Sequence, residues 1–210
     1  MAASSKETVL VPNGVVSRAA QMATAAGVLW IVHYALQLVY GVATGKVLLD
    51  ATGRLWWRLD VLIFFGAYIT TGLALWDLAR LLVSRWKARI AAAFAAFGCV
   101  AGAFGALCGV LFPLLGTPWM IAGKCILALF VAAIVAGIGG LRSPAVPRQT
   151  AVCVLLFGLL TMPLAMLFGM WENRVPAYTV MEVHFVLSGI VWLIAGKRLR
   201  GTAGALSGTR

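Results

Sequence analysis

Hydrophobic positions fall along the chain in six long runs, separated by short stretches that hold most of the charged residues. Each run has close to the ~20 helical residues that cross a hydrocarbon core of ~30 Å. Because backbone polar groups find no partner in lipid, the runs are predicted to be helices. A transmembrane barrel would instead show short alternating strands, which this pattern lacks. The predicted helices lie near residues 22–44, 61–83, 90–115, 118–141, 149–171 and 176–196.

Composition supports lipid as the main solvent of the chain. Of the 210 residues, 62% are hydrophobic and only 11% are charged, and the mean hydropathy is +0.98. A soluble domain carries about 25% charged residues, so this chain has too little polar surface to cover a globule in water. We therefore expect an all-α, six-transmembrane-helix bundle that forms one polytopic membrane domain over 1–210. The small, polar tail 201–210 is expected to be disordered.

The distribution of Lys and Arg predicts the orientation, because cytoplasmic loops of membrane proteins collect these residues. One predicted side of the membrane carries twelve of them: Lys6, Arg18, Arg80, Arg85, Lys87, Arg89, Arg142, Arg148, Lys197, Arg198, Arg200 and Arg210. The other side carries four: Lys46, Arg54, Arg58 and Arg174. Both termini are therefore predicted to be cytoplasmic, in a multi-pass protein of a bacterial cytoplasmic membrane. The net charge of +11 follows from this bias, and no basic face interleaved with aromatics indicates nucleic-acid binding.

The longest connection between predicted helices, 45–60, is expected to face outside. Its Trp56 and Trp57 are interpreted as an interfacial aromatic anchor. The four cysteines lie in apolar runs without CxxC or Cys/His spacing, so no metal site is predicted.

Glycines at spacings of four, three and four mark one face of the third predicted helix: Gly98, Gly102, Gly105 and Gly109. Such a stripe lets the backbone of another helix approach closely. The fourth predicted helix offers a matching small surface: Ala132, Ala133, Ala136, Gly137 and Gly140. We expect tight packing of these two helices, with a contact between copies of the chain as the alternative.

A polar stripe on the first predicted helix contains His33, Gln37 and Tyr40, spaced four and then three apart. Polar residues of a spanning helix are expected to face the bundle interior or a water-filled cavity. The structural alternative is an interhelical hydrogen-bond patch, worth about 0.6 kcal/mol per bond in membranes.

Ionisable residues of the predicted spans gather in the outer half of the bundle. Glu182 lies ~9 Å below the outer end of the sixth helix, and Lys124 lies at a similar depth in the fourth. Their matched depth predicts an ion pair, unless Lys124 extends to the interface instead. His184 follows Glu182 by two residues, about 200° around the helix. In the inner half, Asp77 is interpreted as the partner of Arg80 at i+3.

Three functions fit these residues. The first is binding or transport of a small organic or lipophilic solute at a site in the outer half, lined by His33, Gln37, Tyr40, Lys124, Trp171, Tyr178 and His184, with Glu182 orienting the solute. The second is an intramembrane enzyme for a lipid or isoprenoid, with Glu182 as the proton donor and Asp60 or Glu172 assisting. The third is electron transfer by a haem held between His33 and His184. A further alternative is an accessory subunit of a larger complex. The sequence contains no Walker, nucleophile-elbow, zincin or dinucleotide motif.

Overall fold

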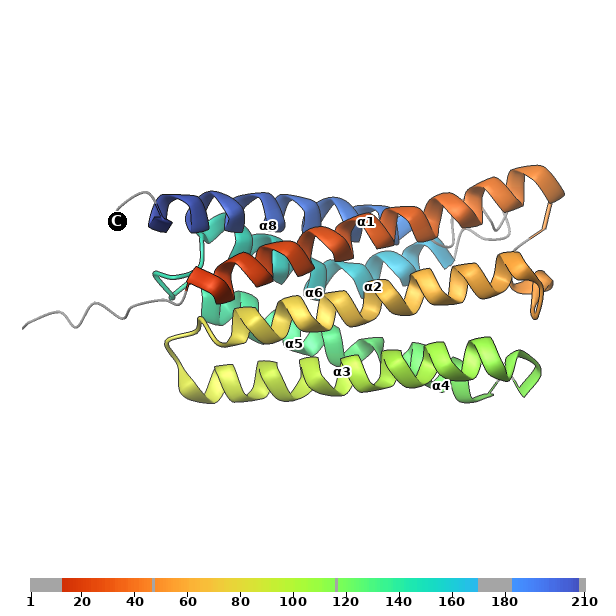
Figure 1. The fold of residues 1–210 in the computed structure, drawn as a ribbon, viewed down its shortest axis with the longest axis horizontal. Helices are drawn as coiled ribbons and strands as arrows, with labels where there is room; N and C mark the ends of the chain where they lie inside the picture. The colour runs from red at the N-terminus through yellow and green to blue at the C-terminus, as the bar shows by residue number, and fades with distance from the viewer. Residues whose placement is uncertain (1–12, 47, 116, 170–182, 208–210) are drawn as a thin grey trace, which may run out of the picture.

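The chain forms an elongated bundle of helices in its computed structural model (Figure 1). The structure describes residues 13–46, 48–115, 117–169 and 183–207, and within them all side chains except those of 49, 50, 117, 119, 162–169 and 205–207. Every regular element in these ranges is helical, so the all-α prediction is confirmed. The elements are α1 (Asn13–Thr44), η1 (Leu48–Ala51), α2 (Leu55–Ala79), α3 (Arg85–Leu111), η2 (Pro113–Leu115), α4 (Thr117–Lys124), α5 (Ile126–Gly140), α6 (Arg148–Gly169) and α8 (Val183–Ser207).

The helices close into a ring through contacts between neighbours. α1 packs against α2, α2 against α3, α3 against α4 and α5, α5 against α6, and α6 against α8. α8 then returns to pack along α1, so the first and last described helices are neighbours (Figure 1). The start of α1 and the end of α8 lie at the same end of the bundle.

Four helical segments are long and apolar enough to cross a membrane: α1, α2, α3 and Met120–Gly140, which joins α4 to α5. Large apolar side chains are exposed along their outer faces, among them Val39, Leu62 and Phe97. A water-soluble bundle would bury such residues, whereas lipid is a good solvent for them. These features indicate a multi-pass integral membrane protein in contact with the bilayer.

Two helices extend well beyond their predicted bounds. α1 begins at Asn13 rather than near residue 22, and α8 continues to Ser207 rather than ending near 196. The prediction of a disordered tail from residue 201 was therefore wrong for 201–207. Small residues explain the extension, because Ala19 and Ala20 are fully buried and Ala203 packs against the same core. Packing between helix ends stabilises residues that hydropathy alone leaves out.

The connection before α2 is shorter than predicted. Gly45 ends α1 with a φ of +70° and donates its N–H to the Gly41 carbonyl at 2.7 Å, a common helix stop. Gly53 has a φ of +83°, and α2 begins two residues later. Only half of the predicted tryptophan anchor is exposed: Trp56 is 51% exposed, but Trp57 is buried at 2%.

The glycine stripe of α3 faces the bundle interior, and all four glycines are buried. Its partners are more varied than predicted, because Gly98 lies against Leu129 of α5 whereas Gly109 lies against Val61 of α2. Gly137, on the small surface of α5, packs instead against Leu155 of α6. The stripe therefore seats α3 between α2 and the α4–α5 pair.

We expect Gly105→Ala to destabilise the bundle. A Cβ at this position would overlap the ring of Phe65, which is 1% exposed, and would lie 2.9 Å from the Ala122 Cβ. Overpacking of this kind costs about 1–3 kcal/mol. Thermal unfolding of the purified variant measures the loss. Gly123→Ala is the control, because a Cβ there meets nothing within 4 Å. Equal stability of the two variants would contradict the close packing.

Candidate functional site

A buried polar cluster joins α1 to α2. His33 Nδ1 lies 2.7 Å from Asp60 Oδ1, and Gln37 Nε2 donates to Asp60 Oδ2 at 2.8 Å. The arrangement follows from helix geometry, because residues four apart lie on one face of α1. Both oxygens of one carboxylate are thus engaged by two side chains of the neighbouring helix.

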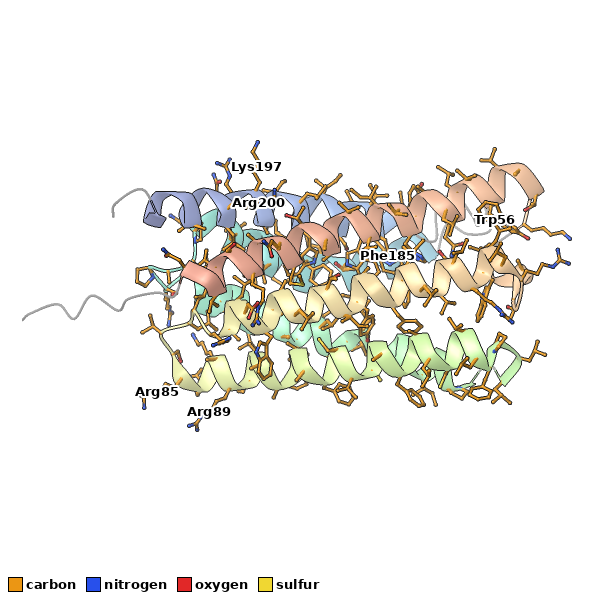
Figure 2. All side chains as sticks on the ribbon, in the orientation of Figure 1. Trp56, Arg85, Arg89, Phe185, Lys197 and Arg200 are labelled. Atoms are coloured by element: carbon orange, nitrogen blue, oxygen red, sulfur yellow. The ribbon has the colours of Figure 1, made fainter. Side chains whose placement is uncertain are left out.

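Aromatic rings enclose the imidazole of His33. The Phe64 ring from α2 and the Phe185 ring from α8 lie with their centroids 5.1 Å and 5.2 Å from it. Trp30, one turn before His33, stacks on Phe185 at 4.7 Å and donates its indole N–H to Thr71 Oγ1 at 3.1 Å. Phe185, labelled in Figure 2, is buried within the bundle, and its ring lies close to rings of both α1 and α2. The cluster therefore has an apolar wall.

Both His33 and Asp60 of this cluster are buried. His33 is 3% exposed and Asp60 is 6% exposed. The sequence placed Asp60 at the outer end of its helix, but α2 begins at Leu55, so Asp60 lies about 8 Å inside it. A carboxylate removed from water is costly unless it is hydrogen-bonded. The two α1 side chains supply those bonds.

His184 lies on the α8 side of the same region. It is buried, and its ring centroid is 4.0 Å from that of Phe185. One turn later on α8, Ser188 donates to the His184 carbonyl at 2.9 Å. Ser188 Oγ and Thr161 Oγ1 of α6 lie 3.3 Å apart. Phe185 therefore contacts the rings of both histidines of this chain.

The other predicted site residues are distributed as follows. Tyr40 is partly buried and packs against the hydrophobic core of the bundle. Lys124 is exposed at the last residue of α4, as expected if its side chain extends outward rather than into the bundle. Four predicted residues lie outside the described ranges: Trp171, Glu172, Tyr178 and Glu182. The pairing of Glu182 with Lys124 stays a prediction.

A second buried carboxylate lies at the opposite end of the α1–α2 pair. Asp77, 1% exposed, accepts a hydrogen bond from Arg18 Nε at 2.6 Å, and Arg18 Nη2 contacts its other oxygen. Arg80, the predicted partner, is farther away, with Nη1 at 3.9 Å. The predicted ion pair with Arg80 is therefore present. The sequence missed Arg18 as the closer partner, because only the longer α1 brings Arg18 alongside Asp77.

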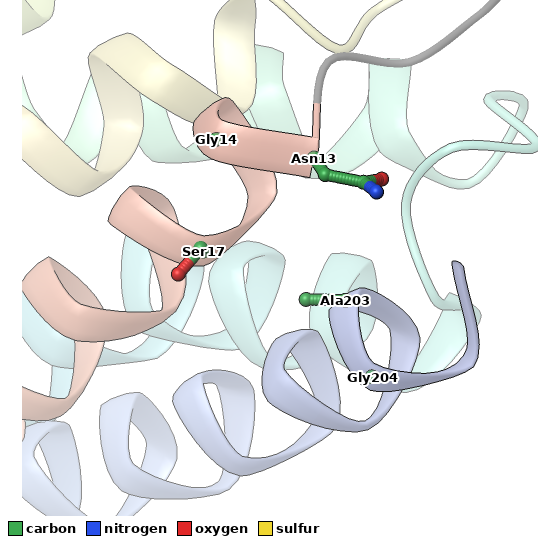
Figure 3. Close-up of a pocket in the computed structure, with 5 residues that line it drawn as sticks. All are labelled: Asn13, Gly14, Ser17, Ala203 and Gly204. Carbon is green, nitrogen blue, oxygen red and sulfur yellow. The ribbon is translucent and has the colours of Figure 1, made fainter. Parts of the chain in front are cut away.

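A shallow hollow of about 390 Å³ lies at this second end, between the start of α1 and the end of α8. Figure 3 shows Asn13, Gly14 and Ser17 on one side, facing Ala203 and Gly204 on the other. None of these residues was predicted to belong to a site.

In the described part of the chain, no three His, Cys, Asp or Glu residues are grouped closely enough to hold a metal ion. Comparisons of the chain with protein families, with curated proteins and with solved structures gave no match.

Sequence reasoning found His33 and Gln37 but missed the role of Asp60 as their partner, and it missed the aromatic wall entirely. One signal was available: Asp60 and Phe64 are four residues apart, and so share a face once α2 is extended toward the loop. The contribution of Phe185 to the aromatic wall depends on how α8 packs against α1. Residue spacing within one helix does not predict that packing.

Proposed function

We propose that this membrane protein binds or transports a small organic or lipophilic solute at the His33–Gln37–Asp60 cluster. The supporting observation is one carboxylate, buried among apolar rings and held by two side chains of another helix. Ionisable groups inside membrane bundles are costly and commonly mark solute or proton pathways. Aromatic walls with a few convergent polar groups are also typical of small-molecule sites.

The competing interpretation is that the cluster only ties α1 to α2. A membrane hydrogen bond contributes about 0.6 kcal/mol on average, so two neutral bonds would serve that purpose without a buried charge. The carboxylate is thus an expensive choice for adhesion alone. An experiment that separates binding from stability can distinguish the two roles.

The test is a thermal-shift screen of the purified protein with a library of amines, carboxylic acids and neutral amphiphiles, followed by uptake into proteoliposomes. We expect a saturable shift with the wild type that is lost in Asp60→Asn. Stability should change little, because the asparagine oxygen accepts from His33 and the Gln37 amide can reverse.

Ser143→Ala is the matched control. It removes a different buried hydrogen bond, from Ser143 Oγ to the Leu81 carbonyl at 2.6 Å, on the connection between other helices. It should keep the shift. Unchanged solute binding by Asp60→Asn, or a large loss of stability without any binding in the wild type, would contradict the proposed role.

The enzyme alternative depends on Glu182 as the proton donor, which lies outside the described residues, and its assisting acid Asp60 is hydrogen-bonded to α1. The haem alternative receives less support from the described residues. A haem between His33 and His184 would have to displace the Phe185 ring that contacts both.

We propose the predicted orientation as well, with both termini in the cytoplasm. Arg85, Arg89, Lys197 and Arg200 lie toward one end of the bundle and Trp56 toward the other (Figure 2), which matches the bias that sets topology. Single cysteines introduced at Lys46 or Trp56 should react with an impermeant reagent in intact cells, whereas cysteines at Arg85 or Arg142 should not. The reverse pattern would overturn this orientation.

A further inference from the structure

One exposed face of α8 is apolar in the first half of the helix and then becomes cationic. Leu187, Ile190 and Ile194 are 44%, 44% and 43% exposed, at spacings of three and four. The next position on this face is Lys197, which is exposed. The opposite face, which includes Ser188 and Trp192, is buried against α1 and α6. The exposed face therefore points away from the bundle.

Arg200 lies one turn beyond Lys197 and extends the cationic end of this face. Its Nη2 donates to Thr24 Oγ1 of α1 at 2.8 Å, which holds the guanidinium over the line between the two helices. One further turn along α8, Ala203 and Gly204 form a side of the shallow hollow shown in Figure 3. The hollow therefore follows the cations along α8, and neither Lys197 nor Arg200 is among the residues that line it.

No acidic side chain neutralises this surface in the part of the chain that the structure describes. The carboxylates with described positions are Asp60 and Asp77, and both are buried. Lys197 has no hydrogen-bond or ion-pair partner among the described residues. The site therefore presents two cations next to an apolar stripe, without compensation from any carboxylate of the described residues.

We infer that the α8 face binds an anionic phospholipid, with the phosphate headgroup at Lys197 and Arg200 and an acyl chain along Leu187, Ile190 and Ile194. Such a lipid complements the α8 face in two ways. Its negative headgroup matches the two cations, and its acyl chain matches the apolar stripe that precedes them on the helix. A soluble anion uses only the cations, and an acidic protein segment would leave the apolar stripe uncovered. This inference is independent of the proposed solute site.

Native mass spectrometry of the full chain tests it. The protein is extracted in mild detergent with equal amounts of phosphatidylglycerol and phosphatidylcholine that carry the same acyl chains. We expect the wild type to retain phosphatidylglycerol preferentially. Juxtamembrane cations contribute about 1 kcal/mol each, so Lys197→Gln should lower the ratio of retained lipids about fivefold. Lys197→Gln with Arg200→Gln should lower it about 25-fold.

The matched control is Arg85→Gln with Arg89→Gln, which removes two exposed cations at the same end but on α3. It should keep the wild-type ratio. An equal loss in this control would show diffuse attraction rather than a site on α8, and an unchanged ratio in the α8 variants would overturn the inference. Displacement of the lipid by an equal concentration of glycerol phosphate would assign the cations to a soluble anion instead. Lys197→Gln leaves the Arg200–Thr24 bond in place, so its result does not depend on that contact.

Discussion

Gly189→Ala is expected to cause one of the largest losses of stability of any single-methyl addition to this chain. A Cβ at Gly189 would lie 2.8 Å from the carbonyl oxygen of Gly27 and 2.6 Å from Ile31 Cγ1. The reciprocal substitution meets the same obstacle, because a Cβ at Gly27 would lie 2.7 Å from the Gly189 carbonyl oxygen. Backbone oxygens cannot rotate aside as a ring can.

The two helices must therefore separate to accept the methyl group, and α1 and α8 would lose contact along their length. We expect a cost at or above the upper end of the about 1–3 kcal/mol typical of overpacking. Gly189→Leu should prevent assembly of the bundle. Unfolding in detergent, followed by heat or by a denaturing detergent, measures both effects.

Gly201→Ala is the control on the same helix. A Cβ at Gly201 meets nothing within 4 Å, and alanine favours a helix by up to about 1 kcal/mol over glycine. This variant should be as stable as the wild type or more so. If Gly189→Ala and Gly201→Ala unfold alike, α1 and α8 do not cross as closely as the structure indicates.

The second large effect concerns the pair formed by Arg18 and Asp77, and it is expected to be asymmetric. The Arg18 side chain is 54% exposed, whereas that of Asp77 is 1% exposed. Arg18→Gln would leave the carboxylate buried, with Arg80 Nη1 at 3.9 Å as its nearest described cation. Asp77→Asn would leave an arginine that can reach water or lipid headgroups.

Arg18→Gln should therefore destabilise the protein much more than Asp77→Asn. The double variant should recover most of the loss, because breaking a buried pair is costly mainly through the charge left behind. The comparison needs the melting temperatures of the two single variants and the double variant under one condition. Equal losses in the two single variants, or no recovery in the double variant, would show that Asp77 gains its main stabilisation elsewhere.

The helices themselves could be predicted from the sequence because lipid leaves the backbone no other choice. Hydropathy located the centres of the helices, but their ends depend on packing. Ala19, Ala20 and Ala203 are weak hydropathy signals, and they extend α1 and α8 by fitting between neighbouring helices. The α2 start was missed for a related reason, since Arg54 and Arg58 made the first turn resemble a loop.

The candidate site was predictable in part. The spacing of His33 and Gln37 placed both on one face of α1, and burial of that face followed from the cost of polar groups in lipid. Their partner could not be deduced, because Asp60 is 27 residues from His33 and its depth depends on the start of α2. Arg18 and Asp77 are 59 residues apart and posed the same difficulty. Which residues pair across two helices depends on how the helices are aligned along their length, and a single sequence does not reveal that alignment.

The two carboxylates whose side chains the structure describes, Asp60 and Asp77, lie on α2, and their closest partners lie on α1. Alone in lipid, α2 would carry two acidic groups without their α1 partners, and acidic groups in a membrane are costly. Together with α1, it presents an outer surface that lipid accepts. The first two helices therefore suit lateral release from the insertion machinery as a hairpin, before the rest of the chain has been synthesised.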